Sequence, residues 1–471
     1  MSVRAIRGAV AAAAVSITAA AHADFRAALE EYRAGHYEAA RAQFLALAEL
    51  GDCSSQFNLG AMALKGEGGP KDEGSAAGWL RSAAGNGCEP LVGSTLAGLE
   101  KRLDAAQSRS ASAIVARYGR ETLREQGIVD PDFLCRGETP ASVLESPTPE
   151  LPRLDGGAPR EAIVITALTI GVDGLARDPE ILLAVPQKGY AAAAVESWLN
   201  SRFTPASRGG VPVASRLQAR LVFGVAGGKG LAEFEPLRSA RERADAGERE
   251  AAYTAGLAAT LDPSLGLSPA RAVQLLLSAA RDGESRAQYW VGAQLRATSD
   301  CHPRANGAVW LRHAAEGGSA AARLMIAEEL LAGSPSAAQA GEARTFLEQA
   351  SDDDGFYVGK HVAARLATSP LDAVRDPPTA LKVALGLAAG QIQCDPQMFE
   401  TVAAAYAANG DFRHATAEQR IAIRKAEALG WNTRSLKDRL AAYRAERPWR
   451  GDLLASPPPS ASPSAAARGG L

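Results

Sequence analysis

Apolar residues recur at helical spacing along most of the chain, and one short pattern is written twice. The stretch WLRSAAGNG at 79–87 returns as WLRHAAEGG at 310–318. Related stretches lie about one repeat away from these two, at a step of 35 or 36 residues for the clearer copies. They begin at Phe44, Leu275, Phe346 and, more weakly, Ala384. This period is typical of stacked helical repeats, and it predicts that Trp79 and Trp310 are core residues.

Each repeat predicts two helices. The recurring stretch predicts the end of the second helix, and its glycine ends that helix. The first helices are predicted within 54–72, 285–295 and 320–333. Gly60 and Gly292 hold equivalent places in them, where a missing Cβ lets the paired helix come close. A lone helical hairpin cannot bury its apolar stripe, so the repeats are expected to stack.

Between the repeats the hydrophobic period changes from about 3.6 to about 2 residues, which indicates strands. Two strand-like runs within 162–187 flank Asp173–Gly174, a typical hairpin turn. An alanine-rich helix at 190–200 and an alternating strand at 216–225 follow. The insert is therefore predicted to be a small ββαβ domain. Alternate side chains of its last strand are expected to pack on the helix around Trp198; these are Leu217, Ala219, Leu221 and Phe223.

The predicted fold class is mostly α, with two α-solenoid arrays of helical-hairpin repeats flanking a small α+β (ββαβ) domain. The segments expected along the chain are a signal peptide at 1–23, N-terminal repeats with a capping helix at 24–135, a linker at 136–160, the inserted domain at 161–226, a second linker at 227–244, C-terminal repeats at 245–450 and a disordered tail at 451–471. The capping helix is expected at 104–127.

The first residues have the three-part pattern of a secretory signal peptide. MSVRAIR carries two arginines and no acid, an apolar run follows, and small residues flank His22 before Asp24. The apolar run is shorter than the roughly 20 residues that cross a bilayer. We therefore expect cleavage and export to a bacterial periplasm. The alternative is an uncleaved N-terminus that holds the protein at the inner membrane.

The five cysteines are Cys53, Cys88, Cys135, Cys301 and Cys394. An exported chain can form disulfides, and an odd number leaves at least one thiol outside an internal pair. Cys53 and Cys88 hold equivalent places in neighbouring repeats, which pack about 10 Å apart. A disulfide spans less than about 7 Å between Cα atoms. The helix at 104–127 runs back toward Cys88, so the predicted pair is Cys88–Cys135.

Neither the composition nor the known catalytic and metal-binding motifs indicate a specific chemical activity. Apolar residues make up 46% and charged residues 22%, as in ordinary globular proteins, and 51 Lys+Arg against 53 Asp+Glu provide no field for nucleic acid. Neither a G-x-S-x-G nor an H-E-x-x-H motif occurs, and Cys301–His302 lacks a second ligand pair at zinc spacing. We expect no enzymatic activity, no metal, no cofactor and no nucleic-acid partner.

The stretch 51–87, GDCSSQFNLGAMALKGEGGPKDEGSAAGWLRSAAGNG, resembles Sel1-like repeats, which are relatives of the tetratricopeptide repeat. The resemblance covers about 25–103 and, more loosely, about 245–430. Later repeats lack the family's usual loop, and the last one, 398–430, is more similar to an ordinary tetratricopeptide repeat. The resemblance implies two helical arrays with curved grooves.

The insert resembles the TonB C-terminal domain, the periplasmic end of energy transducers for outer-membrane uptake. VDG at 172–174 and the motif RFTPASRGGVPV at 202–213 carry this resemblance. The matching motif positions are Phe203, Pro205, Ala206, Gly210, Pro212 and Val213. In that family the last strand binds partner peptides by strand addition. Here this implies a site at Arg216, Leu217, Gln218, Ala219, Arg220, Leu221, Val222 and Phe223.

The sequence is thus interpreted as a non-enzymatic periplasmic scaffold linked to envelope transport. Its repeat grooves and the sheet edge would bind proteins or peptides of the cell envelope, such as receptor peptides of the outer membrane. The inserted domain is equally compatible with a purely structural spacer. Two further alternatives are a TonB-like energy transducer anchored by its N-terminus and a protein that binds or hydrolyses the cell wall.

Overall fold

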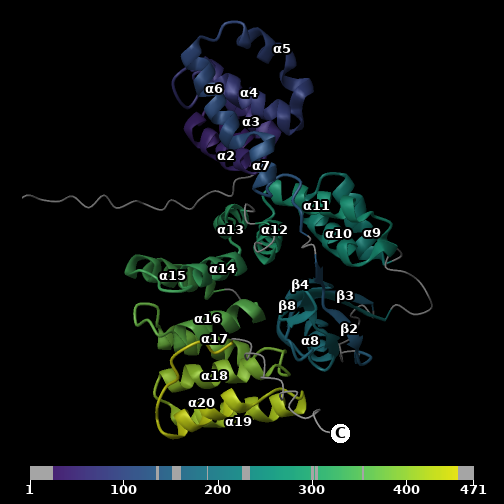
Figure 1. Ribbon diagram of the computed structural model, residues 1–471, viewed down its shortest axis with the longest axis vertical. Coiled ribbons are helices and arrows are strands. Elements are labelled where there is room, and N and C mark those ends of the chain that lie inside the picture. Colours follow the sequence, from purple (N-terminus) through teal and green to yellow (C-terminus); the bar gives the residue numbers. More distant parts are fainter. Residues whose placement is uncertain are drawn as a thin grey trace, which may run out of the picture.

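The computed structural model describes residues 25–133, 137–150, 161–187, 189–224, 234–298, 302, 306–352 and 355–454. Most of them form helices, which pair as antiparallel hairpins and stack (Figure 1). The helical-repeat fold is therefore confirmed. The predicted signal peptide at 1–23 and most of the predicted tail lie outside the described residues.

The N-terminal array begins with α1 and ends with α7. Its helices are α1 (Phe25–Arg33), α2 (Tyr37–Glu49), α3 (Cys53–Lys65), α4 (Glu73–Ala83), α5 (Glu89–Glu100), α6 (Ala105–Tyr118) and α7 (Arg120–Glu125). Asp52 and Asp72 begin α3 and α4 by accepting backbone N–H bonds from Ser55 and Ser75. The capping helix predicted at 104–127 is two helices, because the backbone becomes extended at Gly119.

The C-terminal array consists of α9 (Glu235–Asp245), α10 (Arg249–Leu261), α11 (Pro269–Arg281), α12 (Ser285–Ala297), α13 (Gly307–Glu316), α14 (Ala320–Leu330), α15 (Ala337–Ala350), α16 (Phe356–Thr368), α17 (Pro377–Ala388), α18 (Pro396–Ala408), α19 (Phe412–Ala428) and α20 (Arg434–Arg444). The described part of the segment predicted as a second linker, 227–244, belongs mainly to α9 rather than to a linker.

The predicted close approach at Gly60 and Gly292 is confirmed. A Cβ on Gly60 would lie 2.8 Å from Leu80 Cγ, and a Cβ on Gly292 would lie 2.8 Å from Leu311 Cγ. Each glycine belongs to the first helix of a hairpin and each leucine to the second. Gly256 of α10 makes the same approach, with Leu276 Cγ 2.9 Å from its virtual Cβ. The glycine thus sets the helix spacing in three hairpins.

Both predicted core tryptophans are buried. Trp79 stacks on Tyr118 with ring centroids 4.6 Å apart. Trp310 is 0% exposed and lies in a large core that also contains Leu50 and Leu123 of the N-terminal part. Because this core spans residues from both arrays, the two arrays join directly.

Polar contacts reinforce the junction of the two arrays. Arg281 Nε donates to the carbonyl oxygen of Leu50 at 3.3 Å. The backbone N–H of Asn306 donates to the carbonyl oxygen of Gln126 at 2.7 Å. The helices therefore continue from one array into the other, and the strands form an excursion from this superhelix (Figure 1).

The inserted unit contains the predicted ββαβ order. It consists of β3 (Ala162–Ile170), β4 (Ala176–Val185), α8 (Ala191–Leu199) and β8 (Ser215–Phe223), with an antiparallel sheet in the order β4-β3-β8. The predicted hairpin at Asp173–Gly174 joins β3 to β4, and Gly174 has the positive φ of 71° that this turn uses.

Short strands extend the unit. They are β1 (Glu138–Thr139), β2 (Ser142–Glu145), β5 (Arg202–Thr204), β6 (Ala206–Arg208) and β7 (Val211–Val213). β1 pairs with β6, and β2 pairs with β5. The described part of the segment predicted as a linker, 136–160, therefore adds two strands to the insert.

The sheet unit is wedged into the bend of the C-terminal array (Figure 1). On one sheet face, Ala219, Leu221 and Phe223 share a core with Trp198 of α8, with Leu217 packed against it, as predicted. On the other face, Ile163 and Ile165 belong to the core of α10 and α11. The outer side of α8 packs on α19 through residues that include Val195, Leu199 and Ile423. The insert thus has repeat helices on both sides.

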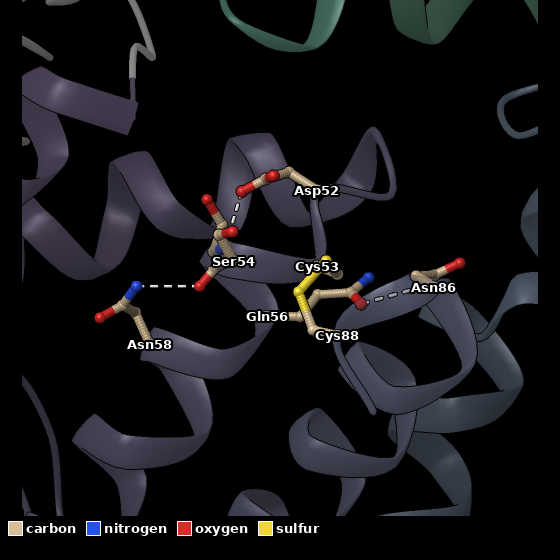
Figure 2. Close-up of a disulfide and its surroundings, with 8 residues drawn as sticks. Asp52, Cys53, Ser54, Gln56, Asn58, Asn86 and Cys88 are labelled. Carbon is tan, nitrogen blue, oxygen red and sulfur yellow. Dashed lines mark hydrogen bonds between the residues drawn. A yellow bond between two sulfur atoms is a disulfide. The ribbon is translucent and has the colours of Figure 1, made fainter. Parts of the chain in front are cut away.

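The predicted disulfide is wrong, because the structure pairs Cys88 with Cys53, at 5.6 Å between their Cα atoms (Figure 2). The prediction assumed regular packing distances between repeats. Instead, the chain kinks within Ala84–Cys88, where Gly87 has a non-helical φ of 116°, and this kink brings Cys88 to the start of α3. Cys135 lies outside the described residues. Asn86 in the same segment donates to Gln56 Oε1 at 2.9 Å.

Adding one methyl group at Gly60 tests the helix spacing. We expect Gly60→Ala to lower the free energy of unfolding by about 1–3 kcal/mol, because the new Cβ meets the buried Leu80 side chain. The matched control is Gly98→Ala in α5, where no atom lies within 4 Å of the virtual Cβ. This control should stabilise by up to about 1 kcal/mol. Thermal melting of both variants compares them, and equal stabilisation would contradict the packing argument.

Candidate functional site

The predicted site residues, Arg216–Phe223, lie together on β8, at the edge of the sheet. Residues from Ser215 to Phe223 pair with β3 in one continuous antiparallel register. Within the described ranges, no backbone hydrogen bond joins the other edge of β8 to another segment. As far as the described residues show, the strand therefore has the free backbone edge that strand addition requires.

The edge is not uniformly accessible. Its side chains are buried on the face that packs on α8, whereas Arg216 is exposed and Gln218 is half-buried on the opposite face. In the second half of the strand, Arg220 is directed toward the end of α10. Its Nε donates to the carbonyl oxygen of Leu261 at 3.1 Å, and its Nη2 lies 3.0 Å from Asp262 Oδ2. We therefore call Ser215–Gln218 the open edge.

The face of β8 opposite α8 contacts the repeats. The side chains on this face are Arg216, Gln218, Arg220 and Val222. Gln218 Oε1 accepts a hydrogen bond from Trp290 Nε1 of α12 at 3.2 Å. This contact was not predicted, and it makes α12 a neighbour of the open edge.

A bulge in β4 directs a carboxylate out of the sheet. Asp178 and Pro179 together stand opposite the single residue Leu168, because the register shifts between Ala167 and Thr169. Asp178 has a φ of 54°, a left-handed conformation that aspartate tolerates better than most residues. The bulge thereby turns the Asp178 side chain toward α16.

Asp178 connects the sheet to α16 and α18. Its Oδ1 lies 3.0 Å from Lys360 Nζ and 2.8 Å from His361 Nε2. Its backbone N–H donates to Gln397 Oε1 at 3.1 Å. Lys360 is 0% exposed and also contacts Asp395 Oδ2 at 2.9 Å. A buried ammonium group with two carboxylate partners thus lies at the boundary between sheet and array.

The open edge is tied to the same cluster through Arg216. Its Nη1 donates to the carbonyl oxygen of Asp178 at 2.8 Å, and its Nη2 donates to Glu180 Oε2 at 2.7 Å. Its guanidinium also lies over the ring of Tyr357, 5.1 Å from the centroid. The position of the first residues of β8 is therefore fixed by α16 as well as by β3.

Mutual attraction keeps these groups charged. Burial alone would raise the pKa of Asp178, but His361 and Lys360 hold it well below its usual value. Burial alone would lower the pKa of His361, but Asp178 and Glu328 raise it to about 9. Burial likewise opposes the charge of Lys360, whose pKa is nevertheless raised by Asp395 and Asp178. We call these residues, with Arg216, Glu180 and Arg365, the ion cluster.

Two cavities lie where the insert meets the repeats. The first, of about 320 Å³, is lined by the array-facing side of the sheet, α12, α14 and α16. The second, of about 800 Å³, lies among β4, α8, α16 and α17. The smaller cavity includes Arg216 and Gln218, so it adjoins the open edge.

Neither metal ligands nor membrane spans are found in the part of the chain that the structure describes. It contains no group of three His, Cys, Asp or Glu side chains arranged to hold a metal ion. None of its helices is long and apolar enough to cross a bilayer.

Sequence reasoning missed Asp178, Lys360 and His361. The available indication was that Lys360 and His361 interrupt the apolar stretch 356–364, since buried charges need partners. The partner could not be named, because Asp178 and His361 are 183 positions apart in the chain.

Comparison with known proteins gives little further information. No protein-family model matches the chain, and no curated protein matches it. Among solved structures, it is similar to the crystal structure of c5321, a protective antigen of uropathogenic Escherichia coli strains that displays an SLR fold. The two are 14% identical with a TM-score of 0.33, over 90% of this chain and 77% of that chain. The helical-repeat fold described above rests on the chain's own stacked hairpins.

The raised pKa of His361 predicts a stability that depends on pH. The charged imidazole stabilises the docked sheet fully below pH about 6.5, the unfolded value, and this contribution disappears as pH rises through about 9. We expect His361→Gln to lower the free energy of unfolding by about 2–3 kcal/mol near pH 6. The difference from the unsubstituted protein should shrink by pH 10.

Melting temperatures of both proteins from pH 6 to pH 10 measure this effect. The neighbouring carboxylates Asp178 and Glu328 have lowered pKa values, so they remain ionised across this range. His36→Gln, at an exposed position, is the control and should show no such convergence. A deficit of His361→Gln that stays constant across this range would contradict the assignment.

Proposed function

We propose that this protein is an exported, non-enzymatic scaffold of the bacterial cell envelope that binds an extended peptide at the open edge, Ser215–Gln218. One observation carries the proposal: β8 has a single strand partner, β3, within the described ranges, and its first residues contact the array through Tyr357 and Trp290. Strand addition supplies affinity through main-chain hydrogen bonds, and a rigid edge reduces the entropy lost on binding.

The resemblance to the TonB C-terminal domain supports strand addition at this strand. The order of β3, β4, α8 and β8 agrees with the expected ββαβ arrangement. Within the shared motif, Phe203 and Ala206 are buried beside Trp198, and Gly210 has a positive φ in the turn before β7. These motif residues shape the unit, whereas the backbone of β8 would meet the partner.

Export is supported by the disulfide Cys53–Cys88, because disulfides persist in oxidising compartments such as the periplasm. An envelope location makes peptides of envelope proteins the natural partner class, with segments of outer-membrane receptors as the leading case. In this proposal the repeats position the sheet and orient the peptide.

Selection from a peptide library tests the proposal. Random ten-residue peptides displayed on phage would be selected against residues 24–471. We expect the selected peptides to slow amide hydrogen exchange in β8 more than in β4, because only β8 gains a strand neighbour. A purely structural spacer predicts no such peptides, and binders that protect only the helices would also contradict the proposal.

Two adjacent proline variants identify the edge. Backbone N–H groups of a strand point alternately to its two sides, so one of Leu217→Pro and Gln218→Pro removes an outward N–H. We expect that variant to keep its melting temperature within about 2–3 °C and to lose peptide binding, whereas the other loosens the sheet. Gln218→Ala controls for the lost contact with Trp290. Normal binding by both folded proline variants would exclude strand addition here.

A further inference from the structure

The cavity of about 320 Å³ adjoins the open edge and lies between the sheet and the repeats. Arg216 and Gln218 line it from β8, and Tyr289 and Trp290 line it from α12. Arg296 and Ala297, at the exposed end of α12, also line it and mark its accessible side. The cavity therefore belongs to neither unit alone and exists only because the sheet is docked.

The charged groups of the cavity have partners: Arg216 pairs with Asp178 and Glu180, and Arg296 pairs with Glu329 of α14. Arg216 is shared between the Asp178 carbonyl oxygen and the Glu180 carboxylate, and it also reaches Thr169 Oγ1 at 3.2 Å. Gln218 is engaged by Trp290. A ligand group that contacts this part of the wall therefore needs no charge of its own.

The remaining wall is largely aromatic and apolar. Tyr289, Trp290 and Tyr357 contribute rings, and Met325 contributes a thioether. Flat side chains pack well against such rings, and a thioether adds a favourable contact with an aromatic group. This surface is suited to an uncharged aromatic group.

The direction of an added strand leads to this cavity. A peptide beside β8 would lie about 4.8 Å away, and its alternate side chains would point to the same side as Arg216 and Gln218. That side is the array-facing side, where the cavity lies. The open edge spans only four residues of β8, so main-chain bonds alone give a short contact.

We propose that the partner peptide is anchored by one aromatic residue, Phe, Tyr or Trp, whose side chain enters this cavity while the peptide pairs with the open edge. This inference rests on the proposed strand addition and adds a sequence requirement to it. The repeats thereby take part in recognition, since α12, α14 and α16 form most of the far wall. Aromatic anchors in enclosed pockets commonly dominate the affinity of an interface.

Two phage libraries separate this inference from the proposed function. One library of ten-residue peptides contains all amino acids, and the other lacks codons for Phe, Tyr and Trp. We expect the full library to converge on one aromatic position, and its binders to be roughly tenfold or more tighter than those of the second library. Equally tight binders from both libraries, with β8 protected in each case, would refute the aromatic anchor and leave strand addition intact. Absence of binders that protect β8 from either library would refute both.

A large side chain at the accessible side of the cavity tests the same inference by changing the protein instead of the peptide. We expect Ala297→Trp to weaken the selected aromatic peptide by roughly tenfold and to leave its alanine-substituted version nearly unchanged, as measured by fluorescence anisotropy. Ala338→Trp, at an exposed position of α15, is the control and should change neither affinity. If Ala297→Trp melts early, Gln294→Trp blocks the same cavity from α12. An equal loss for both peptides, or no loss for either, would overturn the inference.

Discussion

The contact between Asp178 and the pair Lys360–His361 determines how the insert sits in the superhelix. Removing a charge from water costs several kcal/mol unless a partner of opposite charge is close. Here four carboxylates and four cationic groups meet: Asp178, Glu180, Glu328 and Asp395 with Arg216, Lys360, His361 and Arg365. Moving the sheet would separate these partners and leave Lys360 buried beside only the carboxylate of its own array. The cluster therefore favours one docked position over many loosely packed ones.

This docking changes what the repeats offer to a partner. The bend of the C-terminal array, which would otherwise be an open groove, is filled by the sheet on one side and by α8 on the other. Binding surfaces of the array are thus shared with the insert. The edge of β8 is a product of this arrangement, because Arg220 directs one half of the strand toward α10 while Arg216 holds the other half beside α16.

Periodicity in the sequence predicts features that depend on neighbours along the chain. The hairpin repeats, the close approach at Gly60 and Gly292, and the alternation of Leu217 to Phe223 all follow from local spacing. Features that depend on a backbone irregularity were not predictable. The Cys53–Cys88 disulfide depends on a kink at Gly87, and the ion cluster depends on a bulge that reverses the direction of Asp178. Neither irregularity leaves a periodic trace in the sequence.

An exposed sheet edge is a hazard, since it can pair with any other edge and aggregate. A three-stranded sheet alone would offer the whole of β8. The array reduces this hazard at the second half of the strand, where Arg220 binds Leu261 and Asp262 at the end of α10. Four open residues are too few to stabilise unspecific pairing between copies, because short strand contacts are marginal in water. A partner must then obtain the rest of its affinity from side chains, and α12 stands where those side chains would point. Docking the sheet against the repeats thus converts an edge open to any strand into one that selects among strands.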